Sequence, residues 1–161
     1  MGRRREPIGK WRQLFESWLF RPKRDYTFGP PASAEQLKAV ESALSVKLPT
    51  EIRSLLSEFN GVWRQWNLPG KEIVYFSTDG MLTDVAEYLR KGSDPPVTPS
   101  GIDLRKVVFV AQMNGFADLY GVCTEALGEF RAGRVVKLDH ESGELEPAWI
   151  SFKKFVEHGP K

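Results

Sequence analysis

The sequence predicts an α+β fold in which an N-terminal helical hairpin and a C-terminal helix pack on one face of a mostly antiparallel β-sheet. Three observations lead to this prediction. Two helical stripes follow each other at residues 33–46 and 49–59, a strand, a turn and a second strand occupy residues 107–123, and an amphipathic stretch closes the chain at residues 149–156. Helices at both ends of a run of turn-connected strands are the pattern of an α+β domain.

Composition and charge describe an ordinary globular protein with a basic N-terminus. The chain of 161 residues fits one domain and contains 41% hydrophobic and 27% charged residues. Residues 1–25 carry eight basic and three acidic side chains, whereas the rest of the chain carries 15 basic and 18 acidic ones. Because the body is mildly acidic, we expect no nucleic-acid partner, and we interpret the basic N-terminal residues as a solvated tail.

The single cysteine and the lack of long apolar stretches indicate the cellular environment. Cys123 has no second cysteine to pair with, so a reducing compartment is the simpler interpretation. No segment approaches the roughly 20 apolar residues that cross a bilayer, and no small-residue cleavage site follows the first apolar stretch. We therefore expect a cytoplasmic protein.

The first predicted element is an amphipathic helix that ends at Pro22. Five apolar residues recur at helical spacing on one face: Trp11, Leu14, Phe15, Trp18 and Leu19. The leading interpretation is an extra core helix, and the alternatives are a helix on a membrane surface or a contact with a partner or second copy. The chain is therefore divided into two parts. Residues 1–32 contain this helix and the proline-rich linker that follows it, and residues 33–161 form the main domain.

The helical hairpin comes next. Ser33 begins the first helix, and Gln36 three residues later is the return partner of a capping box. The second helix begins at Pro49 and ends before Asn60-Gly61, which tolerate the left-handed backbone beyond a helix end. Since only a few residues connect the two helices, we expect them to pack as a hairpin.

A loop with two tryptophans around an arginine follows at residues 62–71. Trp63, Arg64 and Trp66 have the composition of an interface hot spot, so we take them as candidate partner-binding residues. The alternative is that both indoles fold back as a lid on the core, because soluble monomers avoid large exposed apolar patches.

The middle of the chain predicts a strand, a helix and a loop. Residues 73–76 form a short apolar strand, and the apolar face of residues 82–89 predicts a helix capped by Thr78 or Asp79. Residues 92–101 contain three prolines and are too polar for the core, so we expect a loop.

The C-terminal part of the chain supplies most of the sheet. The nearly continuous apolar run at residues 107–111 predicts a central strand, and residues 119–123 return antiparallel after a turn. Residues 134–140 predict a further strand, and a loop at residues 144–147 leads to a closing helix capped by Ser151.

The sequence contains no recognisable catalytic or metal motif. HExxH, CxxC and the glycine-rich phosphate loops are missing. Cys123 falls in a predicted strand, where a lone cysteine is usually a small buried side chain. His140, between Asp139 and Glu141, is interpreted as part of a solvated hairpin end. We therefore predict a protein that is not an enzyme and has no metal or cofactor.

The residues that shape the helical hairpin also form a family-like pattern: Leu37, Val40, Glu41, Leu44, Leu48, Pro49, Ile52, Leu55, Leu56, Asn60 and Gly61. With the glycine-containing turn, the tyrosine-bearing strand and the Ser-Phe ending near the C-terminus, this pattern resembles the SUKH superfamily, or Smi/Knr-like group. The resemblance covers about residues 33–157 and leaves the N-terminal helix outside. The chain departs from the family at Ile52, where an aromatic residue is common, and at Val62, where a second glycine is common.

The resemblance implies a function in protein binding, because the superfamily includes yeast cell-wall assembly regulators and many bacterial immunity proteins. We expect an immunity protein that occludes the active site of a cognate toxin, and the acidic body suits a basic nuclease toxin. The alternative is a scaffold or regulatory interaction protein, held at a membrane by its N-terminal helix. The candidate contact residues are Trp63, Arg64 and Trp66, together with Asp118, Asp139 and Glu141 at the turn ends of the sheet.

Overall fold

The computed structural model describes residues 9–17, 26–65, 71–92, 94, 96–112 and 118–159 of the chain. Its helical elements are α1 (Lys10–Ser17), α2 (Ala34–Leu44), α3 (Thr50–Glu58), α4 (Thr78–Gly80), the π-helical turn η2 (Met81–Val85), α5 (Ala86–Lys91), the 3-10 turn η3 (Leu104–Lys106) and α6 (Phe152–His158). Its strands are β1 (Tyr26–Phe28), β2 (Val62–Gln65), β3 (Lys71–Tyr75), β4 (Val107–Gln112), β5 (Leu119–Cys123), β6 (Val135–Leu138) and β7 (Leu145–Trp149).

The seven strands found in the described residues form one antiparallel sheet in which each strand pairs with its neighbour along the chain. Helices α2 and α3 are inserted between β1 and β2, and the segment from α4 to η3 is inserted between β3 and β4. Antiparallel neighbours need only short connections, so each insertion leaves the order of the strands unchanged. The predicted α+β class is confirmed.

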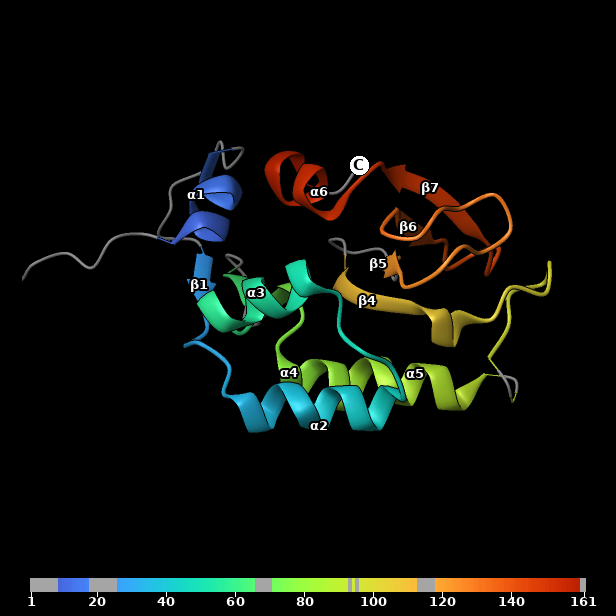
Figure 1. Cartoon of the computed structure of the whole chain (residues 1–161), viewed down its shortest axis with the longest axis horizontal. Coiled ribbons are helices and arrows are strands. Elements are labelled where there is room, and N and C mark those ends of the chain that lie inside the picture. Colours follow the sequence, from blue (N-terminus) through green and yellow to red (C-terminus); the bar gives the residue numbers. More distant parts are fainter. Residues whose placement is uncertain are drawn as a thin grey trace, which may run out of the picture.

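Strand β4 is the centre of the fold, as its apolar run predicts. Its first five residues are all buried. Figure 1 shows α2 and the α4–α5 segment along one side of β4, and α1 and α6 on its other side. Because helices cover both faces, the strand loses the alternation of a half-exposed strand. The expectation that helices pack on one face only is therefore wrong.

The N-terminal helix α1 is part of the same core. Trp11 and Phe15 are fully buried and belong to one apolar cluster with the residues of the sheet and of α6. The Trp11 ring lies 5.5 Å from that of Phe152, and the Phe15 ring meets the edge of Tyr75 at the same centroid distance. For these two residues the leading interpretation, a core helix, agrees with the structure. Trp18 and Leu19 lie outside the described residues.

A carboxylate from α3 holds the beginning of α1. The Glu58 oxygens accept hydrogen bonds from the backbone N–H groups of Trp11 at 3.0 Å and Arg12 at 2.8 Å. These donors have no partner inside the helix, and a negative charge at a helix N-terminus is stabilising. The indole N–H of Trp11 also donates to the Ser54 hydroxyl at 2.9 Å. Thus α1 is fixed to α3 by polar as well as apolar contacts.

The end of α3 is joined to the start of α4 by a buried side-chain amide. Asn60 is 8% exposed; its Oδ1 accepts from the Thr78 backbone N–H at 2.7 Å, and its Nδ2 donates to the Thr78 hydroxyl at 2.9 Å. Gly61 follows with φ of 95°, and a Cβ placed there would lie 2.8 Å from the Trp63 ring. Asn60-Gly61 is therefore required both for its hydrogen bonds and for its backbone conformation.

Local capping signals are confirmed, with one correction. Ser33 and Gln36 form the predicted capping box of α2, and Ser151 caps α6. The helical segment after β3 is capped by Ser77, whose hydroxyl accepts from the Gly80 N–H, and not by Thr78 or Asp79. Thr78 is instead buried against Asn60.

Four expectations about loops are wrong. Part of the residue 22–32 linker forms β1, and part of the 62–71 loop forms β2 and the start of β3. Strand β7 replaces the loop at 144–147 and the first turn of the expected closing helix; its Pro147 is tolerated because β7 pairs on one side only, with β6. The 92–101 segment also contributes to the interior, because Thr98 is 2% exposed.

We predict that Asn60→Ala lowers the free energy of unfolding by about 3 kcal/mol, because it leaves the buried Thr78 N–H and hydroxyl without their partner. Urea denaturation followed by circular dichroism measures the change. The exposed Ser57, whose hydroxyl donates to the Arg53 carbonyl at 2.9 Å, provides the control. Ser57→Ala should change stability by less than about 0.5 kcal/mol. Equal effects of the two substitutions would contradict the role of Asn60.

We also predict that Trp11→Ala destabilises the protein by about 3–5 kcal/mol, the range for removing a large buried aromatic side chain. Gln13→Ala on the exposed face of the same helix is the matched control and should be nearly neutral. Thermal and urea unfolding of both variants test this. A Trp11→Ala protein as stable as the wild type would show that α1 is not part of the core.

Candidate protein-interaction surface

The predicted tryptophan–arginine group is divided by the structure. Trp63 lies on β2, half-buried, with its ring against the backbone of Gly29 and Gly61. Arg64, the next residue on the strand, is only 8% exposed. Trp66 lies outside the described residues. The two described members are thus strand residues that contribute to the fold.

The predicted acidic residues Asp118 and Asp139 are brought together around a lysine. The Lys137 ammonium, on β6, lies 3.9 Å from the Asp118 carboxylate and 3.8 Å from that of Asp139. It also forms a 2.8 Å ion pair with Glu146 on β7, which raises the pKa of Lys137. Cross-strand opposite charges of this kind stabilise the pairing of β6 with β7.

Asp118 also holds His140 in place. Its Oδ1 lies 3.0 Å from the His140 backbone nitrogen, which donates to it, and 2.7 Å from the ring Nδ1. The hydrogen bond and charge of Asp118 raise the pKa of His140 above its ordinary value. Burial raises the pKa of Asp118, but the hydrogen bonds from His140 outweigh it and the net direction is down. The pair therefore favours an imidazolium beside a carboxylate.

Asp139 forms the β6–β7 turn that Glu141 occupies. Its Oδ1 accepts from the backbone N–H of Ser142 at 2.7 Å and of Glu141 at 3.2 Å, which lowers the pKa of Asp139. This is an Asx-type turn, in which a short side chain replaces a backbone acceptor. The Glu141 side chain points from this turn as an exposed residue. Of the predicted acidic residues, Asp118 and Asp139 thus support the local structure.

The same residues have ligand atoms close enough to consider a metal site. One oxygen or nitrogen of each of Asp118, Asp139 and His140 lies within 4.8 Å of the others. However, the Lys137 ammonium already contributes a positive charge beside both carboxylates. We therefore interpret the cluster as an ion-pair network.

Cys123 has the environment of a structural residue. It is 1% exposed on β5, and burial raises the pKa of its thiol to about 11. The thiolate is the reactive form of cysteine, so a raised pKa disfavours nucleophilic chemistry at neutral pH.

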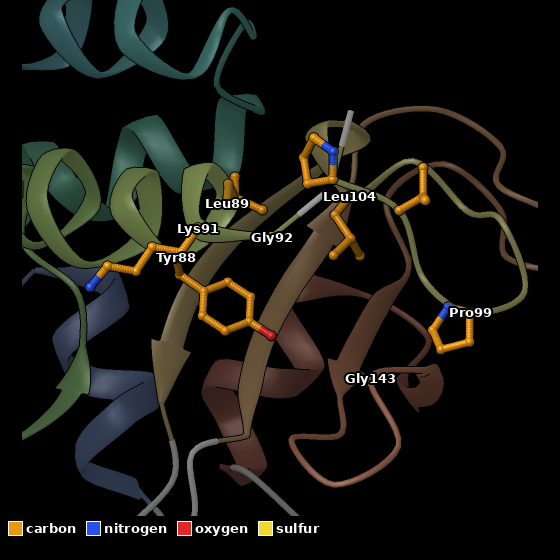
Figure 2. A pocket seen from close by; sticks show the side chains of 9 residues that line it. Tyr88, Leu89, Lys91, Gly92, Pro99, Leu104 and Gly143 are labelled. Atoms are coloured by element: carbon orange, nitrogen blue, oxygen red, sulfur yellow. The ribbon is translucent and has the colours of Figure 1, made fainter. Parts of the chain in front are cut away.

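A groove that the sequence did not predict lies between α5, the 96–104 segment and the β6–β7 turn. Its volume is about 430 Å³, and its lining includes Tyr88, Leu89, Val97, Pro99, Leu104 and Gly143. Figure 2 shows the side chains of Tyr88 and Leu104 reaching the groove from different elements. Pro99 and Gly143 lie on the side of the groove opposite Tyr88. The available sequence signal was an aromatic residue outside the predicted helical stripe, followed by a proline-rich segment.

The 96–104 segment and the β6–β7 turn, which meet at Pro99 and Gly143, are joined by a hydrogen bond. The Ser100 hydroxyl donates to the Glu144 carboxylate at 2.7 Å, which joins the 96–104 segment to the β6–β7 turn. Within the segment, the Thr98 hydroxyl accepts from the Ile102 backbone N–H at 3.0 Å. The groove and the acidic turn therefore form one continuous surface.

Among the described residues, every helix is too short or too polar to cross a membrane.

The fold and the surface define the class of the protein, which is an α+β domain with a helix-covered antiparallel sheet and an apolar groove beside an ion-pair network. A family model, the SMI1 / KNR4 family (SUKH-1), matches residues 31–158. The match covers most of the chain, and the protein belongs to this family. The match begins after both α1 and β1, so these two elements lie outside the matched segment. The comparison with curated proteins finds no match.

We predict that Asp118→Asn lowers the pKa of His140 toward about 6.5, the value of an unperturbed histidine. In the wild type the folded-state pKa is raised, so the stabilisation by this pair is complete below the unfolded-state pKa and is lost as the pH rises through the folded-state value. An NMR titration of the imidazole measures the pKa directly. Asp79→Asn, at an exposed residue of α4, is the control and should leave the titration unchanged. An unchanged His140 pKa in Asp118→Asn would refute the coupling.

Proposed function

We propose that this protein is a non-catalytic immunity protein that binds a cognate protein toxin and blocks access to its active site. The observation that carries the proposal is the family match over residues 31–158, which supports an interaction module of the immunity or regulatory kind. Mechanistically, such a module needs a stable scaffold and a complementary surface, and it needs no catalytic group of its own.

The structure of the described residues is compatible with this role. The potential nucleophile Cys123 is buried, and Asp118, His140 and Asp139 are engaged with one another and with Lys137. The surface of the described residues includes an open apolar groove and an acidic turn. The predicted contact residues Trp63, Arg64, Trp66, Asp118, Asp139 and Glu141 remain proposals. Glu141 is the principal one, because the carboxylates of Asp118 and Asp139 are already hydrogen-bonded within the protein.

A membrane-bound regulator would use α1 differently. While α1 is packed, Trp11 and Phe15 face the core and are not available to lipid. Co-sedimentation of the full-length protein with anionic and with neutral vesicles separates this version from the immunity role. If the protein sediments with neither kind of vesicle, the membrane-bound regulator is wrong.

We predict that co-expression of this protein rescues a sensitive host from the toxic product of the neighbouring reading frame, because binding occludes the toxin's active site. The measurement is growth with and without this protein, followed by pull-down and size determination of the complex. Rescue with a stable complex is expected. For comparison, the Asn60→Ala variant should rescue less, because its lower stability reduces its abundance in the cell. A harmless neighbour that forms no complex would contradict the immunity function.

A further inference from the structure

The groove concentrates the exposed apolar surface of the molecule. In the described part of the chain, three large apolar side chains are exposed: Tyr88 at 45%, Val97 at 40% and Ile150 at 74%. Two of these three line the groove. Aromatic side chains presented in a concave apolar surface are typical anchors of a protein interface, and contiguous exposed apolar patches in a monomer commonly mark such sites.

Acidic side chains outnumber basic ones around the groove. Among the described residues of its lining, Lys91 is the only cation, and it forms a 2.6 Å ion pair with Glu87. On the opposite wall, the β6–β7 turn presents the exposed carboxylate of Glu141 two residues before the groove-lining Gly143. Within the described residues no ion pair is found for Glu141, whereas Glu146 is paired with Lys137. Arg90, next to Lys91 on α5, is also exposed. Asp94 and the turn residues Glu141 and Glu144 outnumber this cation, so the net charge around the groove is negative.

The groove is also formed in advance of binding. The Ser100–Glu144 hydrogen bond holds one wall to the other, and the Thr98 hydroxyl orders the loop that carries Val97 and Pro99. Thr98 itself is 2% exposed. A surface whose geometry is already fixed loses little conformational entropy when a partner binds.

We propose that this groove is the docking site for the protein partner, and that it receives a basic segment of that partner. An apolar side chain of the segment inserts between Tyr88 and Val97, while Lys or Arg residues beside it face Glu141 on the β6–β7 turn. The inference rests on the proposed function and adds to it the surface used and the chemistry of the partner. Charge complementarity favours a basic segment, because carboxylates outnumber cations around the groove and Lys91 is already paired with Glu87.

The first test uses the full-length protein and the toxic product of the neighbouring reading frame in calorimetric and stopped-flow binding measurements. Val97→Asp and Tyr88→Ala should each weaken the complex at least about tenfold, the loss expected for a central anchor. Glu141→Lys should slow association and reduce its dependence on salt, because it reverses the steering charge. Circular dichroism confirms that each variant is folded.

Matched controls lie elsewhere on the surface. Ile150→Asp places a new charge on an even more exposed apolar residue, and Glu129→Lys makes the same charge reversal at another exposed carboxylate. Both should bind within about twofold of the wild type. If the complex forms and the groove variants bind like these controls, the groove is not the docking site, while the immunity function stands.

A second test does not depend on the toxin. The wild-type protein is titrated with the synthetic peptide Lys-Leu-Lys-Lys-Leu-Lys and with its counterpart Glu-Leu-Glu-Glu-Leu-Glu, and backbone amide signals are followed by NMR. The basic peptide alone should shift the signals of Tyr88, Val97 and Gly143. If it leaves them unchanged, or if the acidic peptide shifts them equally, the proposed partner chemistry is wrong. If the basic peptide shifts these signals but co-expression gives no rescue, the groove stands as a docking site for a basic segment and the immunity function is wrong.

Discussion

The side chain of Asn60 is the contact on which the arrangement of helices depends. Its amide satisfies the Thr78 backbone and hydroxyl, and its own backbone N–H donates to the Pro30 carbonyl at 3.0 Å. Next to it, the Gly61 carbonyl accepts from the Gly29 N–H at 3.0 Å. Two consecutive residues thus connect the end of β1, the end of α3 and the start of α4. Buried polar groups are costly when unpaired, so this network permits one arrangement of the three segments.

The position of the groove depends on the hydrogen bonds of Asn60 and Gly61. Thr78 begins the continuous helical segment α4–η2–α5, and Tyr88 stands on its last part. Met81 and Val85 of η2 are fully buried and fix the rotation of the segment against the core. With this face buried, Tyr88 remains outside, next to the 96–104 segment. Its exposure is therefore a consequence of how the helix is anchored.

Sequence patterns predicted the helices and strands that are determined by a few neighbouring residues. They missed the strands that depend on pairing with residues far away in the sequence. The capping box at Ser33, the cap at Ser151 and the apolar run of β4 each lie within a few consecutive residues. By contrast, β1 exists because Tyr26 pairs with Arg64, and β7 because Pro147 pairs with Val136. Strand preference reflects the pairing environment more than the residue itself, so a strand of three to five residues has no signature of its own. The groove was missed for the same reason, because its walls come from three separate segments.

The pairing of charges separates the acidic residues that build the fold from the one most available for a partner. Asp118 orients His140, Asp139 closes its own turn, and Lys137 balances both of them together with Glu146. A partner that contacted these groups would have to compete with hydrogen bonds already made and would gain little net energy. Glu141 has no such competing ion pair in the described residues, and its carboxylate is exposed beside the groove. Sequence patterns identify all of these residues as acidic in the same way, and only the geometry shows which carboxylate can offer its charge to another molecule.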